Sequence, residues 1–318
     1  MTSAATAFHR ALPGYAPTPL RSLDGVAAEL GLGAVWLKDE SARLGLPAFK
    51  VLGASWAAEL ALRDAPGTHT LVAASAGNHG RAVAQVAALR GLRCRVFLPA
   101  RSVPARRDAI AGEGAEVVVL AGTYEEACAA ATAAAAQEGV LEIADVGPHA
   151  TAVIDGYATL FAEIDEPVDV VLVPVGVGSL AAAAVRAHPR VIGVEPERAA
   201  CLTAALAAGH PVEIDTPGTA LAGMDCARVS EGAWPDLRGG IERTITVTDD
   251  ETHAAMRELA ALGLRFGDCG AAPLAALRRA ALAPGTRALL IATEGVTDPE
   301  GYAAVLSAPG PPRARSGR

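Results

Sequence analysis

Residues 70–98 read TLVAASAGNHGRAVAQVAALRGLRCRVFL and contain one complete strand–helix–strand unit. Short apolar runs predict buried strands at Thr70–Ala74 and Arg93–Leu98, and the apolar spacing between them predicts a helix over Asn78–Arg90. A strand, a helix and a second strand in this order indicate a parallel pair joined by a crossover helix. This unit therefore favours an α/β fold with mostly parallel sheets.

The same alternation continues through most of the chain. Further strands are predicted at Glu116–Leu120, Val168–Val175, Val191–Glu195 and Ala288–Thr293. Further helices are predicted at Pro104–Glu113, Tyr124–Glu138, Leu180–Ala187, Thr252–Leu262 and Ala272–Ala281. Ligands of such folds lie at the carboxyl ends of strands, where Gly-rich turns open helices. The turns at residues 75–80, 176–180 and 293–295 are therefore candidate binding loops.

The composition limits the possible classes of partner. The 318 residues are 51% hydrophobic and only 4% aromatic, with a formal net charge of −8. A chain of this length can bury the core of one large domain or of two ordinary ones. An acidic chain without a basic stripe or stacking aromatics is not expected to bind nucleic acid.

The termini and the cysteines indicate a cytoplasmic protein. The N-terminus shows no signal peptide, and no apolar run reaches spanning length, so a membrane is not an expected partner. Five scattered cysteines without a C-x-x-C or Cys/His cluster predict reduced thiols and no metal site. The tail Ala308–Arg318, with three prolines and three arginines, is expected to be disordered.

Lysine is scarce in this chain, which draws attention to the two that remain. Lys38 and Lys50 are the only lysines among 27 Lys and Arg residues. A lysine amine can form a Schiff base once its pKa is lowered, whereas a guanidinium stays charged. Lys50 follows Phe49 at an expected helix start, where the helix dipole favours the neutral amine. Lys38 is interpreted as an ion-pair partner of nearby acids.

The Gly-rich turns allow two interpretations. Free N–H groups at a helix mouth hold anions, so the turn before Asn78 suits a carboxylate and Gly176–Ser179 suits a phosphate. Gly176-x-Gly178-x-x-Ala181 also matches a dinucleotide-binding pattern, with Glu195 at the position of the ribose-binding acid. An NAD-dependent oxidoreductase is therefore an alternative, although this motif explains neither Lys50 nor the Asn78 turn.

Taken together, these segments resemble pyridoxal-phosphate (PLP) enzymes of fold type II, the tryptophan synthase beta-like group. The resemblance is carried by Phe49-Lys50, the Ser-Ala-Gly-Asn-His-Gly turn, Gly176–Ser179 and the late Thr293-Glu294-Gly295. The sequence is most similar to the 2,3-diaminopropionate ammonia-lyase family, within a superfamily that includes threonine and serine dehydratases. The matching segments occur in the family's order along nearly the whole chain.

The resemblance implies roles for individual residues. Lys50 would bind PLP as a Schiff base and then move the Cα proton. Asn78 would contact the 3′ oxygen of the cofactor, and Thr293 the pyridine nitrogen. The phosphate would be bound by Gly176, Val177, Gly178 and Ser179. The substrate carboxylate would be held by Ser75, Ala76, Gly77 and His79.

Three further residues near these motifs complete the list of candidates. Asp155, before Gly156-Tyr157, is a candidate for the substrate amine, with a helix N-cap as the alternative. Glu294 is expected either to support a neighbouring site residue or to be structural. Cys269 could line the cofactor face, but it has no activating neighbour in the sequence that would make it a nucleophile.

The resemblance also implies an architecture and a reaction. Residues 66–155 would form a small α/β domain, and residues 1–65 with 156–318 a large cofactor-binding domain in a three-layer fold. The reaction would be α,β-elimination of a small amino acid by a homodimer, most readily 2,3-diaminopropionate to pyruvate and ammonia. L-Threonine or L-serine dehydration is an alternative, and a non-catalytic sensor is another that the retained Lys50 disfavours.

Position 76 leads to a prediction about stereochemistry. In the ammonia-lyase family that this chain resembles, an Asp usually stands here and serves as base for the D-isomer, but this chain has Ala76. Lys50 reaches Cα from one face only, and alanine has no titratable group for the other face. We therefore expect turnover of L-2,3-diaminopropionate, L-serine or L-threonine, and very little turnover of the D-isomers, measured as 2-oxo acid release. Comparable turnover of D- and L-diaminopropionate would contradict this, and Ala76→Asp should raise D-isomer activity.

Overall fold

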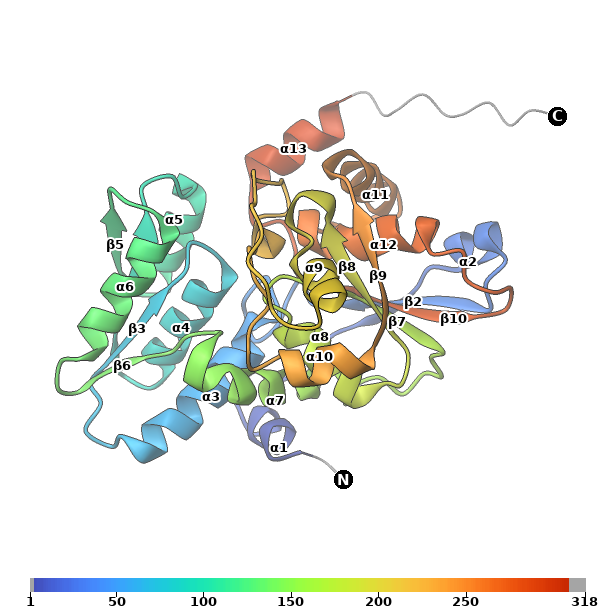
Figure 1. Cartoon of the computed structure of the whole chain (residues 1–318). Coiled ribbons are helices and arrows are strands. Elements are labelled where there is room, and N and C mark those ends of the chain that lie inside the picture. The colour runs from blue at the N-terminus through green and yellow to red at the C-terminus, as the bar shows by residue number, and fades with distance from the viewer. Residues whose placement is uncertain (1–2, 309–318) are drawn as a thin grey trace.

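Two sheets organise the chain in the computed structural model, which describes residues 3–308 (Figure 1). The smaller sheet has four parallel strands in the order β5-β4-β3-β6. These strands are β3 (Thr70–Ala74), β4 (Arg93–Pro99), β5 (Glu116–Leu120) and β6 (Val140–Glu142). The strand–helix–strand unit at residues 70–98 is thus confirmed, and it forms the centre of this sheet.

The larger sheet has six strands in the order β1-β2-β10-β7-β8-β9. They are β1 (Leu20–Ser22), β2 (Ala34–Asp39), β7 (Val170–Pro174), β8 (Val191–Pro196), β9 (Ile241–Val247) and β10 (Arg287–Ala292). Only the edge pair β1–β2 is antiparallel among the described strand pairs. Strand β2, near the N-terminus, lies between β1 and the late strand β10, so both ends of the chain build one sheet.

The helices occupy the connections between strands. They are α1 (Ala4–Arg10), α2 (Asp24–Leu30), α3 (Lys50–Asp64), α4 (Asn78–Leu89), α5 (Pro104–Gly112), α6 (Tyr124–Ala135), α7 (Ala150–Phe161), α8 (Ser179–Ala187), α9 (Cys201–Ala208), α10 (Trp234–Gly240), α11 (Asp249–Ala261), α12 (Asp268–Arg279) and α13 (Pro299–Ser307). All predicted helices are present, with shifted ends. Strands β1, β6 and β9 were not predicted, because β1 and β6 have three residues each and β9 is a partly exposed edge strand.

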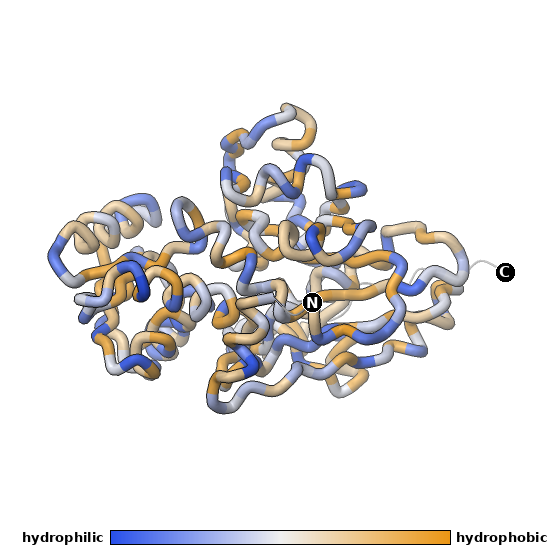
Figure 2. The backbone as a smooth tube through the Cα atoms, turned by 90° about the horizontal axis from the view of Figure 1, so that it is seen from below, coloured by the Kyte–Doolittle hydropathy of each residue, from blue (hydrophilic) through white to orange (hydrophobic). Residues whose placement is uncertain are grey.

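The large sheet is buried on both faces, as strand β7 shows. Val170 and Leu172 pack in a cluster with residues of α11 and α12, whereas Val171 and Val173 pack with residues of α3, α7 and α8. Successive strand residues point to opposite faces, so the sheet is the middle of three layers. Figure 2 shows the hydrophobic stretches of the backbone in orange. The predicted fold class, an α/β fold with mostly parallel sheets, is confirmed.

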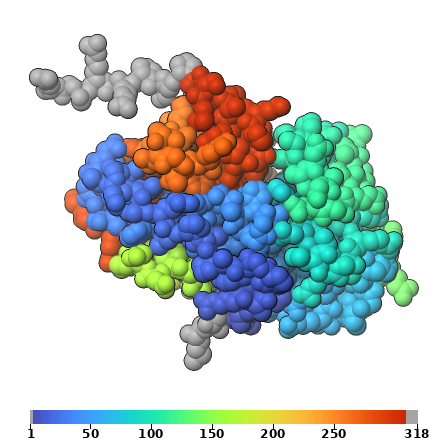
Figure 3. Space-filling model, turned by 180° about the vertical axis from the view of Figure 1, so that it is seen from behind, coloured from blue at the N-terminus to red at the C-terminus, as the bar shows by residue number. Residues whose placement is uncertain are grey.

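The two sheets correspond to two parts of the molecule. Figure 3 shows residues of the small sheet gathered on one side, while the early and late segments of the chain lie together on the other. Residue 155 lies inside helix α7, which packs against α3 and α8, so a domain border at that position would divide one helix. The division at residues 66 and 155 therefore stays a prediction.

Some expectations concern the ends of the chain and its surroundings. Apart from Ala308, the tail predicted to be disordered lies outside the described residues. Across residues 3–308, none of the helices combines the length and the apolar character needed to cross a bilayer. The five cysteines are all free.

A buried network of charges joins the N-terminal strands to the segment that follows helix α7. Lys38 Nζ donates to Glu163 Oε2 at 2.7 Å, and Arg43 Nη1 donates to Glu163 Oε1 at 2.6 Å. Arg43 also pairs with Glu40 at 2.6 Å, and all four side chains have no exposed surface. Lys38 is thus an ion-pair partner, as predicted, but its acid is 125 residues away. Because buried charges need partners, the network fixes the segment that leads to Lys50.

Neutralising Glu163 tests this network. Glu163→Gln should lower the free energy of unfolding by roughly 3–5 kcal/mol, because it leaves the two buried cations short of a counter-charge. Burial would raise the pKa of Glu163, but Arg43 and Lys38 outweigh it and lower this pKa to about 2. The wild-type stabilisation is therefore complete above the unfolded pKa of about 4.3 and is lost as the pH falls through about 2.

Denaturant unfolding at several pH values measures both effects. Glu231→Gln, which breaks an exposed pair with Arg228, is the matched control and should cost less than about 1 kcal/mol. Equal destabilisation by the two variants would show that the buried network does not carry the predicted stability.

Candidate active site

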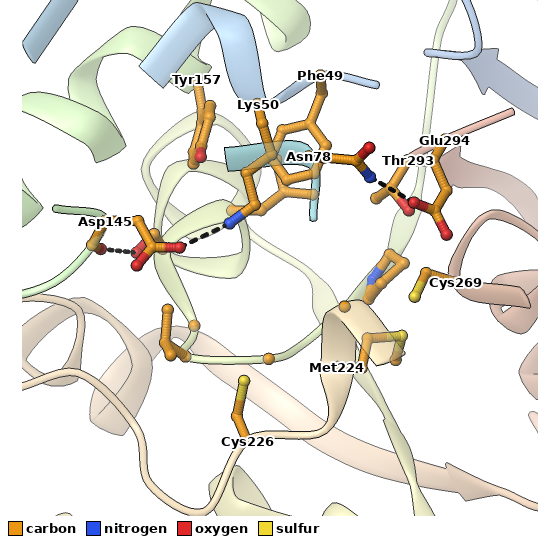
Figure 4. Close-up of a pocket in the computed structure, with 17 residues that line it drawn as sticks. Phe49, Lys50, Asn78, Asp145, Tyr157, Met224, Cys226, Cys269, Thr293 and Glu294 are labelled. Atoms are coloured by element: carbon orange, nitrogen blue, oxygen red, sulfur yellow. Dashed lines mark hydrogen bonds and ion pairs between the residues drawn. The ribbon is translucent and has the colours of Figure 1, made fainter. Parts of the chain in front are cut away.

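The carboxyl ends of strands from both sheets meet at one cavity, shown in Figure 4. Four segments reach it from strand ends: Asn78 after β3, Asp145 after β6, residues 176–179 after β7, and Thr293 after β10. The space between the lining residues, including open solvent at its mouth, amounts to about 610 Å³. Other side chains of the lining are Phe49, Lys50, Tyr157, Met224, Cys226, Cys269 and Glu294.

Backbone pairing places Lys50 beside Thr293. The Phe49 N–H donates to the Thr293 carbonyl at 3.3 Å, and the Gly295 N–H donates to the Pro47 carbonyl at 2.9 Å. Ala48 and Glu294 form the antiparallel bridge between these two bonds. Helix α3 then begins at Lys50 itself, so the predicted helix start is confirmed.

The Lys50 amine carries a charge in this arrangement. Its Nζ donates to Asp145 Oδ2 at 3.0 Å (Figure 4). Burial by itself lowers the pKa of Lys50, but the Asp145 carboxylate, through its charge and its hydrogen bond, outweighs burial and raises it. The expectation that the helix dipole would favour a neutral amine is therefore wrong for this state, because a carboxylate at 3.0 Å outweighs a helix terminus.

Asp145 keeps its charge although it is enclosed. Burial would raise the pKa of its carboxyl, but the Lys50 ammonium, through its charge and its hydrogen bond, holds this pKa well below its usual range. The cavity therefore contains one carboxylate next to one amine.

The Gly-rich loop before helix α8 has the shape of an anion cradle. Gly178 has φ +96°, and a Cβ there would lie 2.6 Å from Leu237 Cδ1, so the position requires glycine. A Cβ on Gly176 would lie 2.9 Å from the Gly223 carbonyl oxygen. Ser179 opens α8, and its hydroxyl donates to the Asp145 carbonyl at 3.4 Å. Backbone N–H groups at such a helix start suit a phosphate.

The opposite wall carries Thr293, Glu294 and Asn78. The Thr293 hydroxyl is buried without a hydrogen-bond partner among the described residues. The Asn78 amide donates to the Glu294 carboxyl, and burial raises the pKa of that carboxyl. Glu294 thus contacts both the cavity and Asn78. Cys269 also lines the cavity, and burial raises the pKa of its thiol well above the usual value, so no reactive thiolate forms.

Several predicted substrate residues lie outside the lining. Ser75, Ala76 and Gly77 form the turn directly before Asn78, beside the cavity. The His79 imidazole faces away and shares a hydrogen bond of 2.8 Å with the Ile143 carbonyl, and burial lowers its pKa.

The position of Asp155 corrects the expectation for that residue. Its carboxylate pairs with Arg186 at 2.7 Å and is about half exposed, so it does not face the cavity. It lies in the interior of α7 and so is not an N-cap either. Residues two positions apart on a helix point about 200° apart, and Tyr157 rather than Asp155 faces the cavity.

Asp145 and Tyr157 are the main residues that the sequence did not reveal. Asp145 follows strand β6, which has only three residues and shows no clear strand pattern. Had that strand been recognised, the carboxyl-end rule would have pointed to Asp145. Tyr157 carries no charge near pH 7, so the sequence favoured the neighbouring acidic residue Asp155 as the candidate.

The dinucleotide interpretation fails at Glu195. Its carboxylate is fully buried and accepts hydrogen bonds from the backbone N–H groups of Leu202 at 2.6 Å and Thr203 at 2.9 Å. It therefore satisfies the first turn of helix α9 and does not reach a ribose. The Gly176–Ser179 loop instead lines the same cavity as Lys50.

The donor set of this cavity fits pyridoxal phosphate. It combines an amine for an aldehyde, a cradle for a phosphate and an unpartnered buried hydroxyl for a ring nitrogen. An orphaned hydroxyl such as that of Thr293 costs free energy unless a ligand satisfies it. Fold and cavity together define the class of fold type II PLP enzymes.

Comparison with known proteins supports the same class of enzyme. The family model described as "Pyridoxal-phosphate dependent enzyme" matches residues 11–294, so the chain belongs to this family. Diaminopropionate ammonia-lyase of Salmonella typhimurium is 31% identical over 93% of this chain and 89% of its own length. The biosynthetic L-threonine dehydratase of the same organism is 33% identical over 76% of this chain but only 48% of its own length.

Solved structures show the same likeness. Diaminopropionate ammonia lyase from Escherichia coli, in complex with an aminoacrylate–PLP azomethine intermediate, superposes with a TM-score of 0.87 and 29% identity, covering 95% of this chain and 90% of that one. The threonine deaminase of T.th. gives a TM-score of 0.82 and 28% identity, covering 92% of this chain and 97% of that one. The protein is a PLP-dependent elimination enzyme of the diaminopropionate ammonia-lyase and threonine dehydratase group.

Thr293 provides a test of how this site holds the cofactor. We predict that Thr293→Ala retains PLP, because the phosphate cradle is intact, but slows elimination roughly ten- to hundredfold through loss of one hydrogen bond of about 1.5–3 kcal/mol. Visible absorbance measures cofactor content, and 2-oxo acid release measures the rate. Thr293→Ser keeps the hydroxyl and should retain the rate; a slow serine variant together with a fast alanine variant would refute the assignment.

Proposed function

We propose that the enzyme eliminates ammonia from 2,3-diaminopropionate to give pyruvate, with preference for the L-isomer. One observation carries this choice of substrate: the Asp145 carboxylate lies inside the cavity, 3.0 Å from the Lys50 amine. A second ammonium group on the substrate matches this charge, whereas the hydroxyl of serine does not need it. Dehydration of L-serine or L-threonine is the second candidate, supported by the similarity to threonine dehydratase and by Ala76.

We assign each side of the cavity one task. Lys50 binds the cofactor covalently, and the residues Gly176, Val177, Gly178 and Ser179 bind its phosphate. Asn78 meets its 3′ oxygen and Thr293 its ring nitrogen. The turn formed by Ser75, Ala76 and Gly77 receives the substrate carboxylate at the N-terminus of helix α4. When bound, PLP withdraws electrons from Cα and so acidifies the Cα proton.

The chain's own groups then handle the proton. With the substrate bound, the Lys50 amine would be the group that takes the proton from Cα. Asp145 lies within hydrogen-bond distance of that amine and stabilises the ammonium that forms. Thr293 is a neutral hydroxyl, and a neutral partner at the ring nitrogen favours elimination over transamination. The buried walls at Phe49 and Tyr157 limit access of water.

Two wider expectations remain predictions. Homodimerisation is expected from the family resemblance, and a cytoplasmic location from the free cysteines. The small part of the chain, residues 66–155, is proposed to move inward when a substrate carboxylate binds.

Borohydride reduction tests the assignment of the covalent lysine. Reduction of the yellow protein followed by peptide mapping should place the label on Lys50, because Lys38 is engaged in the buried pair with Glu163. Lys50→Arg keeps the positive charge and should abolish both the label and the yellow colour. A label on Lys38, or an active Lys50→Ala protein, would disprove the assignment.

Replacing Asp145 tests the substrate. Asp145→Asn should lower the ratio of kcat/KM for L-2,3-diaminopropionate to that for L-serine by roughly ten- to hundredfold, because one charged contact of about 1.5–3 kcal/mol is lost. Release of 2-oxo acid measures both. Asp155→Asn makes the same chemical change outside the cavity and should leave the ratio unchanged. An unchanged ratio in Asp145→Asn would favour the dehydratase alternative.

A further inference from the structure

Tyr157 has a polar atom that the fold does not use. Its side chain is fully buried in helix α7, and its hydroxyl has no hydrogen-bond partner among the described residues. The residue lines the cavity, and Figure 4 shows its hydroxyl directed toward the space that holds the Lys50 amine and the Asp145 carboxylate. A buried hydroxyl without a hydrogen-bond partner is unfavourable. This cost points to a role for the Tyr157 hydroxyl in the site.

The fold holds the tyrosine ring firmly. A Cβ on Gly53 would lie 2.6 Å from Tyr157 Cε1, so only glycine at this point of helix α3 lets the ring approach. The ring of Phe49 packs on the other side, with centroids 4.7 Å apart. A glycine inside a helix is unfavourable by itself. The space that Gly53 leaves for the Tyr157 ring accounts for a glycine at this position. Gly53 lies one turn after Lys50 on α3. The Tyr157 ring packs against Gly53, so it meets the same face of α3 that carries the Lys50 amine.

The charges around the amine define what the phenol can do. Burial raises the pKa of Tyr157 to about 12, against the opposing charge of Lys50, so the phenol stays neutral near pH 7. The other titratable groups whose charges act on the amine or on its partner are Asp145, Cys226 and His79. Burial raises the pKa of Cys226 to about 12 and lowers that of His79, so these two are neutral. A neutral phenol oxygen still accepts hydrogen bonds.

We propose that Tyr157 is a positioning residue for Lys50, whose amine donates one N–H to the phenol oxygen and another to Asp145. Two fixed acceptors hold the amine in one orientation inside the cavity and leave one direction free. This inference rests on the proposed role of Lys50 in binding the cofactor. A merely structural tyrosine would not need its hydroxyl, because phenylalanine fills the same space between Gly53 and Phe49.

The test uses Schiff-base formation without any amino acid. The rate at which the apoprotein turns yellow with PLP is measured against pH, which reports the protonation of Lys50. Tyr157→Phe removes an acceptor that stabilises the ammonium, so the midpoint should fall by about one pH unit, a tenfold change in the protonation equilibrium. With substrate, kcat should fall about tenfold, while KM changes less than threefold.

A matched control is available in the same chain. Tyr302, on helix α13, is also buried with an unpartnered hydroxyl but lies outside the cavity lining. Tyr302→Phe should leave the pH midpoint, kcat and KM unchanged. Should the Tyr157→Phe protein fail to fold, Tyr157→Met, which also lacks the hydroxyl and fills space flexibly, gives the same readout.

The outcomes separate this inference from the proposed function. A midpoint in Tyr157→Phe equal to that of wild type, or an equal shift in Tyr302→Phe, overturns the positioning role. A wild-type protein that turns yellow without label on Lys50 instead overturns the proposed function, whatever the Tyr157 variants show.

Discussion

The pairing of residues 47–49 with residues 293–295 is the contact on which the site depends. Its two backbone hydrogen bonds and one bridge tie the start of helix α3 to the end of strand β10. The Lys50 amine and the Thr293 hydroxyl come from opposite ends of the sequence, yet this pairing sets them in one cavity. Because the bonds are between backbone groups, the register itself defines which side chains face inward.

The buried charge network supports the same loop from the other end. Arg43 lies between β2 and the paired segment, and its guanidinium is held by Glu40 and Glu163. Tyr157 lies within helix α7, and Glu163 lies just after its end. The helix therefore lines the cavity, and the residues that follow it anchor the loop that carries Arg43. Stability and site geometry therefore share the same elements here.

Two carboxyl groups in the cavity have opposite electrostatic surroundings. Asp145 faces the charge of Lys50, and its pKa is lowered despite burial. Burial raises the pKa of Glu294 and outweighs the hydrogen bond from the Asn78 amide. Environments that separate the pKa values of two carboxyls assign them different tasks. One is an anion beside the amine, and the other is suited to orient an amide.

The fold class, the turns that reach the cavity and the helix start at Lys50 were predictable from the sequence, because these depend on local patterns of apolar residues, glycines and helix ends. The positions of Asp145, Tyr157 and Glu195 depend instead on tertiary contacts. The strand before Asp145 is too short to show a pattern, and the choice between Asp155 and Tyr157 depends on which face of α7 packs inward. From the sequence alone, Glu195 was a candidate for binding a ribose. In the fold, its carboxylate caps the start of helix α9. Such contacts join residues distant along the chain, so no local pattern encodes them.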